Sequence, residues 1–187
     1  SYKFRIYPNA EQRALIQKTF GCSRFVYNHF LAQRISEYKA TGKAPTRFQQ
    51  DKMLTALKRE ILWLKEVDSI PLQAELQNLD SAYQGFFRRV KKGEKPGFPR
   101  FKSKRDRRKS YKTKQHITNG KPTIYVDDKH IRLPKLGLVK CRISKEVKGR
   151  ILSATVSQNP SGKYFVALCC TDVEIAPLPS TGAVVGL

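Results

Sequence analysis

The feature that most constrains this fold is an alternating segment at the start of the chain with no strand-like segment beside it in the sequence. Within residues 2–7, apolar Tyr2, Phe4 and Ile6 alternate with more polar neighbours, which predicts a half-exposed β-strand. The residues that follow read as helices, and every other strand-like segment comes after them. A lone strand would leave its backbone groups unpaired. We therefore expect it to join the later strands, with the helices as an insertion between them.

Helical periodicity begins directly after this strand. Asn9 and Gln12 have the spacing of a capping box, so a helix is expected to begin at residue 10. Gly21 is expected to break that helix, and a second helix then runs to Gly42, which closes it.

Two more helices are predicted before residue 94. Thr46 and Gln49 form a second capping box, which opens a helix toward Trp63, and Ser69 with Pro71 begins the most regular helix. Its apolar residues recur at spacings of four and three, as in a heptad seam that packs against a core. This seam comprises Leu72, Leu76, Leu79, Tyr83, Phe86 and Val90.

Short strands follow an irregular segment, residues 95–101, in which two prolines and a glycine exclude regular structure. Tight turns are expected at residues 127–129 and 159–162. Six short strands with tight turns favour a small barrel. Together with the helices that precede these strands, the predicted fold class is α+β. The expected strands are 110–117, 123–126, 130–133, 138–144, 151–158 and 164–171, and a further strand is expected to begin at residue 183 after a linker at 177–180.

The charge of the chain points to a polyanionic partner. The formal net charge is +22 on 187 residues, and nucleic acid is the commonest polyanion in a cell. Between residues 88 and 114 stand fourteen basic residues and two acidic ones, which favours a phosphate backbone over a solvated loop. The basic residues are Arg88, Arg89, Lys91, Lys92, Lys95, Arg100, Lys102, Lys104, Arg105, Arg107, Arg108, Lys109, Lys112 and Lys114.

Other classes of function find little support in the sequence. No run of about 18 apolar residues occurs, so no membrane span is expected, and no hydrophobic signal segment stands at the N-terminus. The four cysteines form no Cys-x-x-Cys pair and are expected to be reduced. The histidines lack metal-ligand spacing, and clustered acids or a nucleophile beside a base are missing. Among aromatic residues flanked by cations, Tyr111 is the best candidate to stack on a base.

Five motifs in a fixed order resemble one known family. The chain resembles TnpB, the transposon-encoded RNA-guided DNA endonucleases related to type V CRISPR effectors. The motifs are Phe4–Asn9 with Gln12, Cys22–Leu31, Pro71–Gln73 with the aromatic pairs that follow, Gly97–Lys102 and Ile131–Gly137.

The resemblance implies a domain architecture and places the catalytic residues outside this sequence. It implies an oligonucleotide-binding-like wedge barrel interrupted by a helical recognition lobe, followed by a RuvC-like nuclease domain and a zinc ribbon. The implied parts are residues 1–8 (first barrel strand), 9–94 (helical lobe), 95–176 (rest of the barrel) and 177–187 (linker and first RuvC-like strand). Catalytic carboxylates, magnesium and zinc are expected only beyond residue 187, so we expect no cofactor and no catalytic residue in this chain.

The resemblance also implies partners and site residues. The partners are a guide RNA derived from a transposon end, a double-stranded DNA target and the RuvC-like part of the same protein, in the cytoplasm of a prokaryote near the nucleoid. Gln73 matches the position that reads a short motif beside the target, and Arg47, Lys52 and Ser69 are added for their proximity to helix starts. The RNA-binding set comprises the basic residues named above with Arg5, Tyr7, Arg24, Asn28 and Tyr111.

Three alternatives remain open from the sequence. The first is a nuclease-dead, RNA-guided regulator that binds DNA without cutting it. The second is a helix-turn-helix DNA-binding protein that uses residues 9–41 without RNA. The third is a full nuclease, of which this chain is one part.

Overall fold

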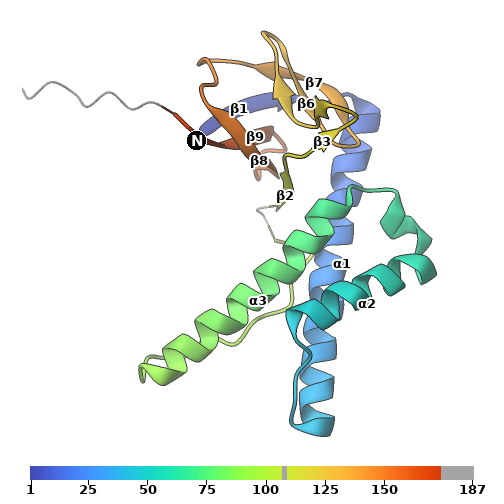
Figure 1. Ribbon diagram of the computed structural model, residues 1–187, viewed down its shortest axis with the longest axis vertical. Helices are drawn as coiled ribbons and strands as arrows, with labels where there is room; N and C mark the ends of the chain where they lie inside the picture. The colour runs from blue at the N-terminus through green and yellow to red at the C-terminus, as the bar shows by residue number, and fades with distance from the viewer. Residues whose placement is uncertain (107–108, 174–187) are drawn as a thin grey trace, which may run out of the picture.

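The computed structural model describes residues 1–106 and 109–173 and divides them into a sheet and a group of helices (Figure 1). The helices are α1 (Ala10–Thr41), α2 (Arg47–Glu60), the short 3-10 helix η1 (Leu62–Lys65) and α3 (Ser69–Lys91). The longer strands are β1 (Tyr2–Tyr7), β2 (Lys109–Lys114), β6 (His130–Leu133), β7 (Gly137–Arg142), β8 (Arg150–Gln158) and β9 (Tyr164–Thr171). Three two-residue strands complete the set: β3 (Ile117–Thr118), β4 (Lys121–Pro122) and β5 (Tyr125–Val126).

The first strand joins the sheet of the later strands, as the sequence predicts, and lies in its middle. The strand order is β2-β8-β9-β1-β7-β6-β5. β1 pairs antiparallel with both neighbours, so that Phe4 lies opposite Val166 on one side and Ile6 opposite Cys141 on the other. The helices are therefore inserted between the first strand and the rest of the sheet.

The sheet is open, and the prediction of a closed barrel is wrong for the residues that the structure describes. Its edge strands are β2 and β5, which do not pair in the strand order. The side-chain amide of Gln115, just after β2, instead bridges to Ile124, accepting from its backbone N–H and donating to its carbonyl, each over 2.7 Å. The sheet thus curls far enough for one side chain to link its two edges. β2 ends at Lys114, and β3 and β4 form a separate two-stranded hairpin.

The sheet and the first part of α1 share one hydrophobic core. Alternate residues of the central strands point inward, and Ile16 and Phe20 of α1 pack among them. Asp127 forms the predicted turn between β5 and β6, since its side chain accepts from the backbone N–H groups of Lys129 and His130. Residues 159–162 form the predicted turn between β8 and β9.

Helix α1 is continuous, so the predicted break at Gly21 is wrong. Both predicted capping boxes are present, at Asn9 with Gln12 and at Thr46 with Gln49. Gly42 ends α1 with a left-handed φ of 72°. Gly21 stays helical because burial of its neighbours on two cores outweighs the modest helix penalty of a glycine.

The helices enclose a second core, and the heptad seam of α3 is buried only in its first half. Leu72, Leu76 and Leu79 are fully buried against α1 and η1, whereas Val90 is 49% exposed. Asp68 begins α3 by accepting from the N–H of Ile70, and its other carboxylate oxygen accepts from the Thr113 hydroxyl over 2.6 Å. One residue thus joins the start of α3 to β2, and the far end of α3 extends away from the sheet (Figure 1).

Candidate nucleic-acid interface

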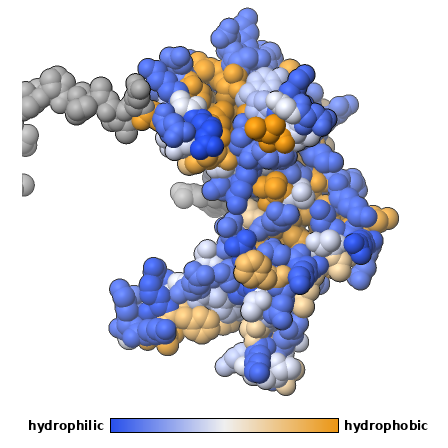
Figure 2. Space-filling model, viewed as in Figure 1, coloured by the Kyte–Doolittle hydropathy of each residue, from blue (hydrophilic) through white to orange (hydrophobic). Residues whose placement is uncertain are grey.

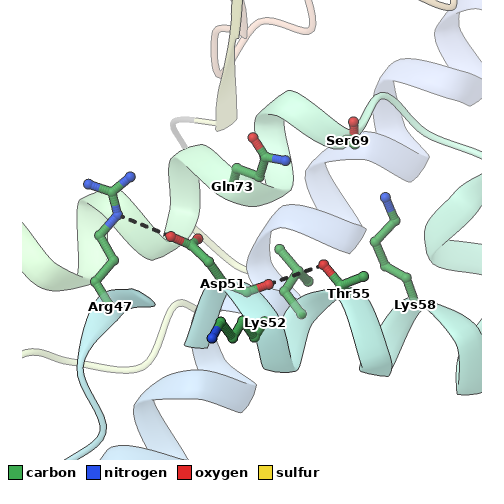
Figure 3. A pocket seen from close by; sticks show the side chains of 8 residues that line it. Arg47, Asp51, Lys52, Thr55, Lys58, Ser69 and Gln73 are labelled. Carbon is green, nitrogen blue, oxygen red and sulfur yellow. Dashed lines mark hydrogen bonds and ion pairs between the residues drawn. The ribbon is translucent and has the colours of Figure 1, made fainter. Parts of the chain in front are cut away.

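The four residues predicted to bind DNA come together in one pocket between α2 and α3 (Figure 3). The Thr46 cap sets the start of α2, so residues 47, 51, 55 and 58 recur on one face. The Asp68 cap does the same for residues 69 and 73 of α3. The pocket has a volume of about 420 Å³ and is lined by Arg47, Asp51, Lys52, Leu54, Thr55, Lys58, Ser69 and Gln73.

Some polar groups of this pocket are engaged with other groups of the protein, and others are left for a ligand. Arg47 Nε lies 3.6 Å from the Asp51 carboxylate one turn later, and the Thr55 hydroxyl donates to the Asp51 carbonyl over 3.3 Å. The Gln73 side chain is exposed, and no hydrogen bond to another part of the described chain holds its amide. Gln73 therefore keeps both a donor and an acceptor for a ligand. The sequence analysis missed Lys58 and Thr55, although helical spacing from Arg47 could have indicated both.

Seven of the nineteen residues predicted to bind RNA line a second surface, which we call the cationic groove. Three neighbouring hollows of about 160, 400 and 330 Å³ share lining residues: Asp106 and Lys109 belong to the first two, and Gly162 to the last two. The three hollows therefore adjoin one another along a surface that runs from α1 past the β8–β9 turn to β1. Its basic residues are Arg5, Arg13, Arg24, Lys102, Lys104, Arg105, Lys109 and Lys163, with Tyr7 beside them.

Asn28 fixes the irregular basic segment to α1. Its side-chain carbonyl accepts from the Lys102 N–H over 2.8 Å, and its amide donates to the Lys102 carbonyl over 2.9 Å. The Lys102 ammonium contacts the buried Glu75 carboxylate and lies 4.5 Å from the centre of the Tyr27 ring. Burial, and then the charge of Glu75, raise the pKa of Tyr27, so that ring stays neutral beneath the lysine. Asn28 and Lys102 thus hold the segment in place, and Glu75 is a partner that the sequence analysis missed.

The Tyr111 side chain points into the core beneath the sheet, away from the exposed side chain of Lys112. Its ring is 6% exposed and packs 5.7 Å from the ring of Phe20. Burial raises the pKa of its phenol well above the ordinary value. In this structure the Tyr111 ring offers no face to a base.

The fourteen predicted basic residues fall into separate places. Arg88, Lys91, Lys92 and Lys95 are exposed at the far end of α3, away from the sheet, and Arg89 donates to the Gly97 carbonyl there. Arg100, Lys112 and Lys114 are exposed outside the groove lining. Arg107, Arg108 and the segment 177–187 lie outside the described residues.

The described part of the chain contains neither a cluster of metal-binding side chains nor a helix that could span a membrane. Within residues 1–106 and 109–173, no three His, Cys, Asp or Glu side chains gather closely enough to hold a metal ion. In the same residues, no helix combines the length and apolar character needed to cross a membrane. All four cysteines lie in this part and are free thiols.

Comparisons with known proteins agree with the motif pattern. A family model described as a helix-turn-helix domain (HTH_OrfB_IS605) matches residues 1–43, which here form β1 and the single helix α1. The chain is 33% identical to "Putative RNA-guided DNA endonuclease" of Streptomyces pristinaespiralis and 31% identical to "Putative RNA-guided DNA endonuclease InsQ" of Escherichia coli K12. Both matches cover 100% of this chain and 45% and 44% of the relatives, so the chain spans slightly less than half their length.

A third relative covers a shorter stretch. "Virulence protein VsdF" of Salmonella dublin is 35% identical over 54% of this chain and 91% of its own length. The two whole-chain matches cover every motif of the set. The chain belongs to the TnpB family, the OrfB group of IS605 elements.

Proposed function

We propose that this chain is the RNA- and target-recognition part of an RNA-guided DNA endonuclease. The cationic groove would hold the scaffold of a guide RNA derived from a transposon end, and the α2–α3 pocket would read a short duplex motif beside the DNA target. One observation carries the proposal: the residues predicted for DNA line one pocket, and seven of the nineteen residues predicted for RNA line a different surface.

The groove has the chemistry that a folded RNA needs. Its lysines and arginines can pair with phosphates, while Tyr7 is 42% exposed and can meet a base or ribose. The two hydrogen bonds between Asn28 and the Lys102 backbone favour RNA binding at the groove. They order Lys102, and with it the backbone next to Lys104 and Arg105, before RNA binds. Such order lowers the entropy lost on binding.

The α2–α3 pocket has the chemistry for reading a base edge. A glutamine amide can donate to N6 and accept at N7 of adenine, which discriminates one base in the major groove. Arg47, Lys52 and Lys58 stand around Gln73 and can fix the register through phosphates. The helical lobe would then cover the guide–target heteroduplex and read its shape.

The cutting step is proposed for another part of the protein. Phosphodiester hydrolysis by paired metal ions needs several carboxylates around them. We assign that step, with its magnesium, to a RuvC-like part of the longer relatives, and zinc to their zinc ribbon. The described residues would position RNA and DNA only.

The test replaces Gln73 and measures motif recognition. In the complete protein loaded with guide RNA, Gln73→Ala should weaken or relax recognition of the target-adjacent motif by about 1–3 kcal/mol, because one bidentate contact is lost. The measurement is the affinity for a library of duplex targets that vary in the motif. Gln77→Ala, one turn later on α3 and outside the pocket lining, is the matched control. Equal weakening on every duplex sequence would exclude Gln73 as a reader of bases.

A second candidate is an RNA-independent helix-turn-helix DNA-binding protein. The description of the family model that matches residues 1–43 favours it. The continuity of α1 argues against it, because a helix-turn-helix needs a turn between its two helices. Sequencing the nucleic acid that copurifies with the protein separates the two: a defined RNA supports RNA guidance, and DNA without RNA supports this candidate.

A further inference from the structure

A fifth hollow lies between the diverging ends of α1 and α3 and shares no lining residue with either proposed nucleic-acid surface. It has a volume of about 590 Å³, within the range of small-molecule sites. Figure 2 shows apolar side chains along the lower arm that α3 forms, with hydrophilic side chains at its tip. We call it the aromatic pocket; its lining includes Ile35, Tyr38, Tyr83, Phe86, Phe87 and Phe98.

The rings of this pocket are packed on one another and still exposed. Phe98 stands edge-on to Tyr83 and Phe86, with ring centres 5.6 and 5.4 Å apart, and Tyr83 and Phe87 stack at 6.3 Å. Tyr38 is 62% exposed, Phe87 56% and Phe98 48%. Water thus reaches the rings of Tyr38, Phe87 and Phe98, and the last two also pack against Tyr83. An exposed apolar patch of this kind marks a binding surface.

The surroundings of the pocket are cationic. Asp80 is the one carboxylate in its lining, and it is occupied by Arg34 at 3.2 Å and Gln84 at 2.8 Å. Lys39 lines the pocket on the α1 side. Arg88 and Lys91 follow Gln84 and Phe87 by one turn, so they continue the same face of α3. A ligand here meets ring faces in the centre and positive charge at the edge.

We propose that the aromatic pocket binds an unpaired nucleobase of single-stranded RNA. An unstacked base offers a flat apolar face, and its phosphates match the surrounding cations; this combination is how proteins bind single strands. A duplex hides its base faces, and an apolar protein segment would leave the cations without partners. The proposal rests on the proposed function in RNA binding and adds a base-stacking site at aromatic residues to which no ligand was assigned from the sequence.

The test compares two oligonucleotides of equal length and charge, one of uridines and one of abasic ribose phosphates. Phe87→Leu and Tyr38→Leu keep apolar volume at exposed positions and remove one ring each. In the full chain, each should weaken uridine-oligonucleotide binding by about fivefold to tenfold and leave abasic binding unchanged. Phe48→Leu, at a 79% exposed ring outside the pocket, is the control and should change neither affinity.

The outcomes separate this inference from the proposed function. If the unmodified chain binds the uridine oligonucleotide and both pocket variants bind it equally well, RNA binding stands and the base site is overturned; the exposed rings would then await a protein surface. If the unmodified chain binds neither RNA nor the abasic strand, the proposed function in RNA binding fails as well. Selective loss on the uridine strand in the pocket variants alone supports the site.

Discussion

At the scale of single residues, Glu75 adds a buried ion pair to the contacts that Asn28 makes with the irregular basic segment. Its carboxylate is 5% exposed and contacts the ammonium of Lys102, whose side chain is 37% exposed. Glu75 is thus an acid buried in a strongly cationic protein and paired with one of its cations. Removing its charge would leave Lys102 partly buried without a counter-ion, which costs more than losing a pair in water.

Glu75→Gln should lower the free energy of unfolding by about 1–2 kcal/mol; the value stays below that of a fully buried pair because Lys102 is partly solvated. Urea denaturation measures it. Glu66→Gln is the matched control, because Glu66 pairs with Lys18 but is 53% exposed, and about 0.5 kcal/mol or less is expected there. Equal losses in the two variants would show that burial of Glu75 contributes nothing to the pair.

The cysteines provide a second residue-scale prediction. Burial raises the pKa of Cys141 to about 11, whereas Cys169 is exposed. The thiolate is the reactive form, so below the ordinary thiol pKa of 9.0 iodoacetamide should label Cys169 first. The protonated Cys141 thiol favours the folded state below pH 9.0, and this contribution is lost as pH rises toward 11. Labelling by mass spectrometry at rising pH checks this; equal rates in urea are the control.

Some single residues could be predicted from the sequence, and others could not. Asn9 and Thr46 cap helices through neighbours three residues away, so local spacing was enough to predict them. Gln73 was singled out by a family motif, and the structure brings it together with Arg47 and Lys52. The contact of Asn28 with Lys102 joins residues 74 positions apart, and no local pattern carries such information.

At the scale of elements, α1 is the main departure from the sequence analysis. A glycine at position 21 predicts a break, yet the helix passes through it because both of its ends are anchored in cores. A Cβ at Gly21 would meet no atom within 4 Å, and its φ is not positive. Local propensity is thus overruled by packing.

Gly21→Ala should therefore raise the free energy of unfolding by about 0.5–1 kcal/mol, since alanine has the higher helix propensity and loses less backbone entropy. Gly42→Ala is the contrasting variant: its φ of 72° should make alanine destabilising by about 1 kcal/mol. Urea denaturation of both variants gives the two signs. A loss of stability in Gly21→Ala would mean that α1 needs flexibility at this position.

In the sheet, too, local features could be predicted from the sequence and the overall arrangement could not. Alternation and turn residues predicted the strands of the seven-stranded sheet and two of its hairpin turns, because these signals are local, but they did not predict the separate β3–β4 hairpin. Whether the sheet closes depends on how far it twists, and the twist of a whole sheet cannot be deduced from the type of any single residue. The side chain of Gln115 links the edges where backbone pairing was expected. Likewise, the seam of α3 predicts a buried stripe, but α1 and α3 diverge along its second half (Figure 1), where Tyr83 and Phe86 line the aromatic pocket.

At the scale of the whole molecule, the position of β1 couples the two cores. The chain leaves the centre of the sheet through α1, which packs first on the sheet and then on α2 and α3. The basic segment then returns across α1 to β2. This route brings Lys102, Lys104, Arg105 and Lys109 beside the cations of β1 and α1, although they are about 100 residues apart in sequence. The groove is a product of the topology, so charge counts alone could not predict it.

The groove makes a prediction about salt. Each phosphate contact adds about 0.7–0.9 to the slope of log affinity against log salt concentration. Replacing Lys104, Arg105 and Lys109 with serine should therefore reduce the slope for RNA by about 2. Replacing the exposed Lys129, Lys145 and Lys148, which line none of the three hollows, removes the same charge and should change it by less than half as much.

The comparison of the two triple variants separates a site from a diffuse field. If net charge alone attracts RNA, both variants lose affinity equally at low salt and their slopes fall together. If the phosphates sit in the groove, only the groove variant releases fewer counter-ions, and its slope falls alone. Equal slopes in both variants would remove Lys104, Arg105 and Lys109 from the interface, and with them the groove as the place where RNA is held.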